Sequence, residues 1–119
     1  MRQEEYLTEL ESISINNKAV DRVESVYGCI LPKVIKQIVS YSKESVFFDN
    51  GFRILSFAEI LDAQADLHVD FKALKLVPIV DCGENDFIVY HTSDNSWSKF
   101  NIVDEIIFKK RTSLTDLFV

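Results

Sequence analysis

Residues 46–55 read Val46-Phe47-Phe48-Asp49-Asn50-Gly51-Phe52-Arg53-Ile54-Leu55, and here the sequence changes from a helical to a strand-like pattern. Two short apolar runs flank Asp49-Asn50-Gly51, and Asn-Gly between such runs is a strong signal for a β-hairpin. The next four residues, Ser56-Phe57-Ala58-Glu59, form a capping box, in which the serine accepts from an orphan N–H and the glutamate reaches back. We therefore expect a hairpin followed by a helix over about 57–65.

Three helices are predicted before the hairpin. Apolar residues recur at helical spacing over about 3–13, 18–27 and 32–42. Asn17 is the expected N-cap of the second helix, and Gly28 suits the left-handed position that ends it. Pro32 is expected to open the third helix, where a missing N–H costs nothing.

The C-terminal half is predicted to be mainly sheet. Apolar runs at 76–80 and 87–90 have strand length and indicate strands covered on both faces or nearly so. Pro78 cannot donate to a ladder, so its strand is expected at an edge or only partly paired. Residues 67–73 are interpreted as a loop, 97–102 and 106–108 as further strands, and 113–118 as a short docked helix. Helices and strands that do not alternate β-α-β predict an α+β fold.

Length and composition set the general class of the protein. At 119 residues and 47% hydrophobic content, the chain is expected to form one domain over 1–119. Its net charge of −6 argues against direct binding of nucleic acid, which needs clustered Lys and Arg. The sequence shows neither an apolar leader nor an apolar run long enough to cross a bilayer, so we expect a cytoplasmic protein that binds no membrane.

The residues that could carry chemistry are few. Cys82 and His91 lie near Asp81, Glu84 and Asp86, but acidic neighbours would raise the pKa of a nucleophilic thiol. The same turn is too short for a calcium loop, and the scattered glycines build no phosphate-binding loop. We therefore predict no catalytic residue, no metal site and no cofactor, and we expect both cysteines to be free thiols.

Acidic residues gather in two intervals of the sequence. Four carboxylates and no Lys or Arg lie between Arg53 and Lys72, and the same holds between Lys75 and Lys99. Such runs are either ordinary solvated surface or a face that meets a basic partner. The carboxylates are Glu59, Asp62, Asp66 and Asp70 in the first interval, and Asp81, Glu84, Asp86 and Asp94 in the second.

Four motifs in order resemble the SUKH superfamily. The first is Glu24-Ser25-Val26-Tyr27-Gly28-Cys29-Ile30-Leu31-Pro32 before an amphipathic helix, and the second is the apolar strand 76–80. The third is the turn Asp81-Cys82-Gly83-Glu84-Asn85-Asp86, and the fourth is the closing Ser113-Leu114-Thr115-Asp116-Leu117-Phe118. The resemblance covers about residues 17–118. The chain departs from the family pattern at two of its positions. The Asn-Gly pair that is usually expected soon after the Leu-Pro helix occurs here only at Asn50-Gly51, after an inserted apolar strand. His91 stands where an aspartate is common.

This resemblance implies N-terminal helices packed on a largely antiparallel, curved sheet with a short C-terminal helix. Most bacterial members of the family are taken to be immunity proteins that bind and neutralise polymorphic toxins, often nucleases or deaminases. No cofactor or catalytic residue is implied. Residues carried over as structural positions are Glu24, Gly28, Leu31, Pro32, Gly83 and Asp86.

The leading hypothesis is a non-catalytic protein-binding module, a bacterial immunity protein that neutralises a cognate toxin, which we expect to be a nuclease. Its predicted partner-binding residues are Glu59, Asp62, Asp66, Asp70, Glu84, Asp86 and Asp94. We expect a monomer or weak dimer. The alternative is a regulatory or scaffolding interaction domain of the same fold without a toxin partner, and a small enzyme is the third possibility.

Overall fold

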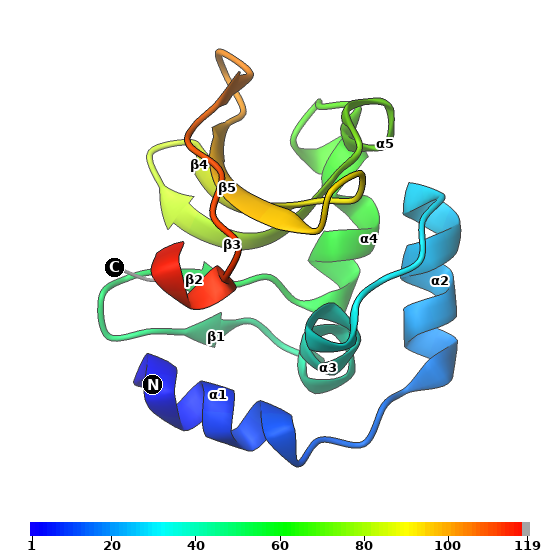
Figure 1. The fold of residues 1–119 in the computed structure, drawn as a ribbon, viewed down its shortest axis with the longest axis vertical. Helices are drawn as coiled ribbons and strands as arrows, with labels where there is room; N and C mark the ends of the chain where they lie inside the picture. The colour runs from blue at the N-terminus through cyan, green and yellow to red at the C-terminus, as the bar shows by residue number, and fades with distance from the viewer. Residues whose placement is uncertain (118–119) are drawn as a thin grey trace.

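The computed structural model describes residues 1–117, in which helices gather at one side of a sheet (Figure 1). The first half of the chain contains α1 (Gln3–Glu11), α2 (Asn17–Tyr27), α3 (Lys33–Tyr41), β1 (Val46–Phe47), β2 (Arg53–Ile54) and α4 (Phe57–Asp66). The second half contains α5 (Phe71–Leu74), β3 (Leu76–Gly83), β4 (Asp86–His91), β5 (Ser96–Asn101), β6 (Ile106–Ile107) and the 3-10 helix η1 (Leu114–Leu117).

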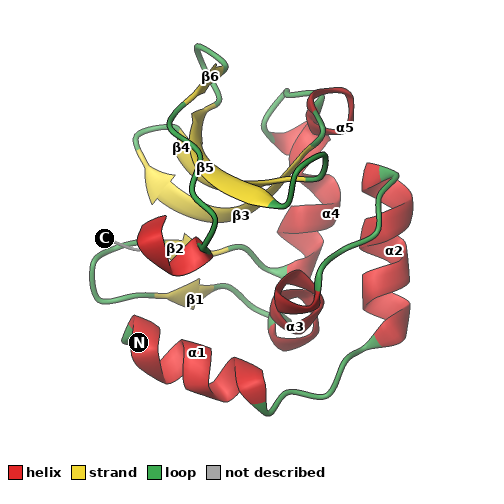
Figure 2. Ribbon diagram, viewed as in Figure 1, coloured by secondary structure: helices red, strands yellow, loops and turns green. Residues whose placement is uncertain are grey.

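The sheet has six strands in the order β1-β2-β3-β4-β5-β6, and every neighbouring pair is antiparallel. Each strand therefore pairs with its neighbours in sequence. Figure 2 shows the central strands twisted and bent rather than flat. Register shifts between Pro78 and Val80 and between Asp81 and Gly83 contribute to this shape, because irregular pairing bends a strand. The prediction of an α+β fold with an antiparallel sheet is confirmed.

The helices cover the sheet in two layers. α4 and α5 pack on β3, and α2 packs on α3, α4 and α5. The hydroxyl of Tyr27 in α2 donates to the carbonyl of Ile60 in α4 over 2.5 Å, so the outer helix is joined to the inner one by a buried polar contact. α1 packs on α3, where the ring of Tyr6 meets Tyr41 edge-on.

One continuous core lies between these layers. Residues Leu76 to Val80 of β3 and Phe87 to Tyr90 of β4 are all buried, as the uninterrupted apolar runs predicted. The largest fully buried side chains come from both helices and strands: Tyr6, Tyr90, Phe71, Phe100, Ile35, Ile38, Ile54, Ile60, Leu76, Ile79, Ile88 and Val23.

The junction between α2 and α3 has a specific closing contact. Gly28 ends α2 with φ 63°, and its N–H donates to the carbonyl of Glu24. The carboxylate of Glu24 then accepts from the N–H of Leu31 over 2.8 Å, which satisfies a backbone donor of the connection. Glu24, Gly28 and Leu31 therefore have a shared structural role, and Pro32 follows as the N-cap of α3.

Several predicted boundaries were wrong by a few residues. α1 ends at Glu11 rather than at 13, and Asn16, not Asn17, is the N-cap of α2, with its side chain accepting from Ala19 N–H. The α4 capping box is confirmed, with both the Ser56 and the Glu59 bonds present.

Two other expectations need correction, and one is confirmed in its second alternative. Residues 67–73 are not all loop, because α5 begins at Phe71 and Asp70 accepts from Ala73 N–H as its N-cap. The strand with Pro78 is interior rather than at an edge, but it is only partly paired there, as the second alternative predicted, because β2 pairs only with Val80 and Asp81. The C-terminal helix is a single 3-10 turn over Leu114–Leu117, and the predicted Phe118 lies outside the described residues.

Among residues 1–117, no helix combines the length and the apolar character that crossing a bilayer requires.

Gly28→Ala is expected to lower the free energy of unfolding by about 1 to 2 kcal/mol, because a side chain is disfavoured at positive φ. The new Cβ would also lie 3.0 Å from Lys72 Cε, although that flexible side chain can move away. Urea unfolding measures the change, and Ser25→Ala on the exposed side of α2 is the matched control. An alanine variant as stable as the parent would contradict this account of the junction.

Candidate partner-binding surface

Arg53 of β2 is the centre of a charged cluster that joins β2, β3 and α4. Its Nη1 lies 2.6 Å from Glu59 Oε1, and its Nη2 lies 3.2 Å from Asp81 Oδ2. Ser45 donates to the same glutamate oxygen over 2.7 Å. Glu59 therefore caps α4 and binds Arg53 at once, so its carboxylate is held in a fixed position.

α4 presents three carboxylates in a stripe. Glu59, Asp62 and Asp66 are spaced i, i+3, i+7, which places them on one side of a helix. Glu59 and Asp66 line a hollow of about 90 Å³, together with Asp81 and Phe87 from the sheet. We call Glu59, Asp62, Asp66 and Asp81 the α4 acidic surface.

Within the described residues, Asp62 and Asp66 are exposed and form no ion pair or hydrogen bond, whereas Arg53 binds the other two carboxylates. The α4 acidic surface therefore combines two fixed carboxylates with two that water alone solvates. With Arg53 included, its formal charge is −3.

Glu84 and Asp86 lie at the turn between β3 and β4. Asp81 is three residues before Glu84, so the turn lies about 10 Å further along the strand. Asp86 accepts from Asn101 Nδ2 over 2.9 Å and so helps to join β4 to β5, whereas Glu84 is exposed in a left-handed backbone conformation.

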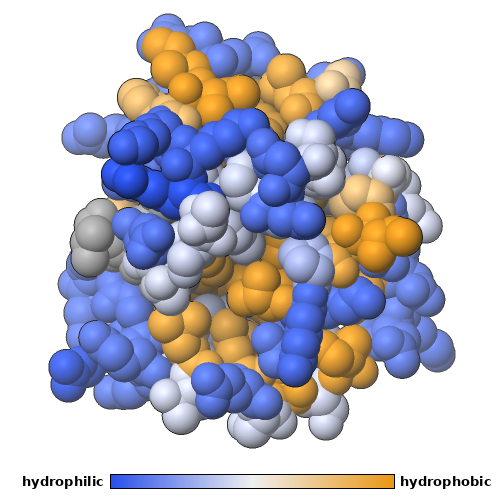
Figure 3. All heavy atoms as spheres, viewed as in Figure 1, coloured by the Kyte–Doolittle hydropathy of each residue, from blue (hydrophilic) through white to orange (hydrophobic). Residues whose placement is uncertain are grey.

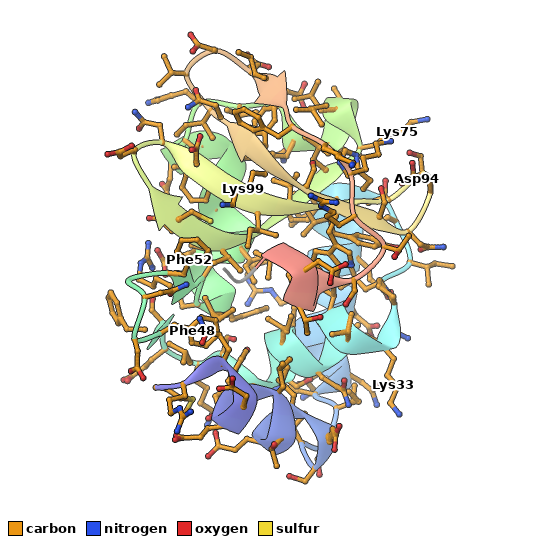
Figure 4. All side chains as sticks on the ribbon, turned by 60° about the vertical axis from the view of Figure 1, so that its left-hand side comes forward. Lys33, Phe48, Phe52, Lys75, Asp94 and Lys99 are labelled. Carbon is orange, nitrogen blue, oxygen red and sulfur yellow. The ribbon has the colours of Figure 1, made fainter. Side chains whose placement is uncertain are left out.

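The structure separates Asp94 from the residues at the β3–β4 turn. Asp94 follows His91, at the opposite end of β4 from Asp86, so about 17 Å of strand lies between them. Figure 4 shows Asp94 and Lys75 on one side of the molecule and Phe48 and Phe52 on the other. Asp94 binds Lys110 over 2.7 Å, and Asp70 is used as the α5 N-cap. The seven predicted residues therefore do not form one continuous face.

Local interactions change the acidity of two of these carboxyls. Burial alone would raise the pKa of Glu59, but hydrogen bonds from Arg53, Ser45 and the Ser56 N–H lower it to about 2. Hydrogen bonds from Lys110 and Ser96 lower the pKa of Asp94 to about 2. Both groups are charged at neutral pH, and each has a cation beside it.

Cys82 and His91 do not meet. They lie at opposite ends of the β3–β4 pairing, because His91 pairs with Leu76 whereas Cys82 lies just before Gly83. Burial raises the pKa of the Cys82 thiol to about 12. His91 is buried with Nε2 2.7 Å from Ser98 Oγ, and burial lowers its pKa. The thiol and imidazole are not arranged as a nucleophile and its base.

A larger cleft lies at the other end of the sheet, and no pattern in the sequence indicated it. It has a volume of about 960 Å³ and lies between the end of α2, α5 and the β4–β5 turn. Lys72, Lys75, Asp21 and Glu24 line it, so charges of both signs are mixed. Glu24 is already used by Leu31.

Over the described part of the chain, no three His, Cys, Asp or Glu side chains are grouped to hold a metal ion. Sequence analysis also missed the role of Arg53, although the arginine at the boundary of the first acidic interval was a visible signal. It lies directly opposite Asp81 in the strand register.

The chain was compared with protein-family models and with curated proteins, and neither comparison found a match. The resemblance to the SUKH superfamily therefore rests on the four motifs in the sequence.

We expect Glu59→Gln to flatten the dependence of stability on pH. The folded pKa of about 2 lies below the ordinary value of 4.5, so ionised Glu59 stabilises the fold above about pH 4.5, and this stabilisation is lost as the pH falls towards 2. The variant should be less stable than the parent at pH 7 and nearly equal to it near pH 2. Chemical unfolding across this range measures both curves. Glu11→Gln, which removes an exposed carboxylate with no hydrogen bond among the described residues, is the control, and parallel curves for Glu59→Gln would refute the proposed role.

Cys82 should react slowly in the folded protein. With a pKa of about 12, its thiolate fraction at pH 7.5 is lower than that of an ordinary cysteine by at least about a hundredfold. Mass spectrometry of a Cys29→Ser variant after iodoacetamide treatment, native and in urea, measures the ratio. Equal rates in both conditions would disprove the expected protection.

Proposed function

We propose that this chain is a non-catalytic protein-binding domain of the immunity type, which neutralises a basic toxin of the nuclease class. The observation that carries the proposal is the α4 acidic surface, where Glu59, Asp66 and Asp81 line a hollow and Arg53 is the cation bound to two of them. Asp62 lies beside the hollow on the same side of α4. A nuclease cleft that binds phosphate is basic, so such a surface is electrostatically complementary to it.

The α4 acidic surface suits this role in a second way. Glu59 and Asp81 are held by Arg53 in the free protein, so ordering these two side chains on binding costs little conformational entropy. Asp62 and Asp66 are free to pair with cations of the partner. Glu84 extends the negative region towards the β3–β4 turn. Asp70 and Asp94 lie outside this proposed surface, since one caps α5 and the other pairs with Lys110.

Electrostatic attraction of this kind acts mainly on the rate of association. Complementary fields raise that rate, and salt lowers it by screening. The measurable property of the proposed function is therefore a salt-dependent association rate that depends on Asp62 and Asp66.

The test uses the product of the gene next to the one for this chain as the candidate toxin. Co-expression should protect cells from that protein, and biolayer interferometry should show binding by this chain. Asp62→Lys/Asp66→Lys is expected to slow association about tenfold or more at low salt, because reversing two charges replaces attraction by repulsion.

Glu11→Lys/Asp21→Lys is the matched control, because it makes the same change in net charge on α1 and α2. This control should associate at close to the parent rate, and both variants should unfold at nearly the parent temperature. The immunity function is contradicted if co-expression does not protect the cells and this chain does not bind the product of the neighbouring gene. Equal slowing by both double variants would show that overall charge, not the α4 acidic surface, sets the rate.

A further inference from the structure

The β5–β6 hairpin ends in a row of exposed apolar side chains. Exposed fractions are 68% for Val103, 48% for Ile106, 45% for Ile107 and 47% for Phe108. Figure 3 shows hydrophobic atoms gathered at the top of the molecule, where Figure 2 places β6. Apolar residues this concentrated on a small protein indicate a contact surface.

The two edges of the sheet differ in what covers them. At β1, the carbonyl of Met1 accepts from Asp49 N–H over 3.0 Å, and the Met1 amine donates to the Phe47 carbonyl over 2.8 Å. At β6, no backbone bond on the outer side comes from any of the described residues. The β6 edge, which has the most exposed apolar residues, is therefore also the edge whose outward backbone groups are left unbonded by the described residues.

The backbone of β6 is oriented to accept another strand. Phe108 N–H donates to the Lys99 carbonyl over 2.9 Å and so points to β5. Because amide directions alternate along a strand, the N–H and C=O of Ile107 point away from β5. Ile107 faces Phe100 in a position that leaves its own polar groups directed outwards.

The charges on either side of Ile107 would complement one another if two copies of this segment ran antiparallel. Residues 104–110 read Asp104-Glu105-Ile106-Ile107-Phe108-Lys109-Lys110, with two acids, three apolar residues and two bases. If two copies pair antiparallel about Ile107, Ile106 lies opposite Phe108 and Glu105 lies opposite Lys109. Opposite charges across an antiparallel pair are stabilising, and two-fold symmetry provides each pair twice.

We propose that a second copy of this chain binds at this edge, with β6 pairing antiparallel to β6 and Ile107 on the two-fold axis. The pairing is short, because Glu105 has φ 53° and interrupts regular strand geometry before Ile106. Lys110 already binds Asp94, so the Glu105–Lys109 pairs provide most of the charge complementarity. A contact of this size makes a weak dimer, with a dissociation constant of about 0.1 to 1 mM. The dimer is independent of the proposed toxin binding, because it uses a different edge of the molecule.

A charge-swap series tests the proposal. Glu105→Lys and Lys109→Glu should each raise the dimer dissociation constant about fivefold or more, because each places like charges opposite one another twice. The double variant Glu105→Lys/Lys109→Glu should restore the parent value. Sedimentation equilibrium up to about 1 mM chain measures the constant at low salt, where charge pairs are least screened. Concentration-dependent NMR shifts of the amides of residues 105–109 locate the contact.

Glu11→Lys and Lys18→Glu are the matched controls, since each changes the net charge equally at an exposed position on another element. NMR spectra with the parent dispersion establish that each swap variant is folded. A chain that stays monomeric at about 1 mM would overturn the proposal. So would a dimer whose shifts map to other residues, or a double variant that does not recover.

Discussion

The bond between Arg53 and Glu59 is the contact on which the relation of helices to sheet depends. Arg53 lies in a strand of only two residues, yet its guanidinium reaches Asp81 on β3 and the first turn of α4. Glu59 is at the same time the N3 residue of the α4 capping box. The start of α4 is thus fixed to two strands by directional bonds, and apolar packing alone would leave its position along the sheet less defined.

This arrangement also determines the character of the surface above it. Charges removed from water are costly unless they are paired. Without Arg53, the carboxylates of Glu59 and Asp81 would therefore lose their shared partner and repel one another. The cluster contains one more acid than base, and α4 adds Asp62 and Asp66 beside it. A structural ion pair and a surface suited to a basic partner therefore share the same residues, and changes to one affect the other.

Local signals in the sequence were enough for most of the fold. The Asn50-Gly51 turn, the Ser56 capping box and the Gly28 helix end all depend on residues close together in the chain, and all three are present. α5 was missed because four residues are too few for a helical period, and only its Asp70 cap could have indicated it. The candidate site was harder to predict from the sequence than the fold. Asp94 and Lys110 lie sixteen positions apart and meet only because β5 and β6 bring them together, so a count of charges along the chain could not pair them.

The sequential order of the sheet has a consequence for how the chain reaches this structure. Every strand pairs with the next one along the chain, and the β3–β4, β4–β5 and β5–β6 connections are only a few residues long. Closing such short loops costs little entropy, so these hairpins can form early and locally. The β2–β3 pairing must instead close a loop that contains α4 and α5. We therefore expect the docking of the β1–β2 hairpin onto the β3–β6 meander to be the slow step of folding, with the Arg53–Asp81 contact among the last to form.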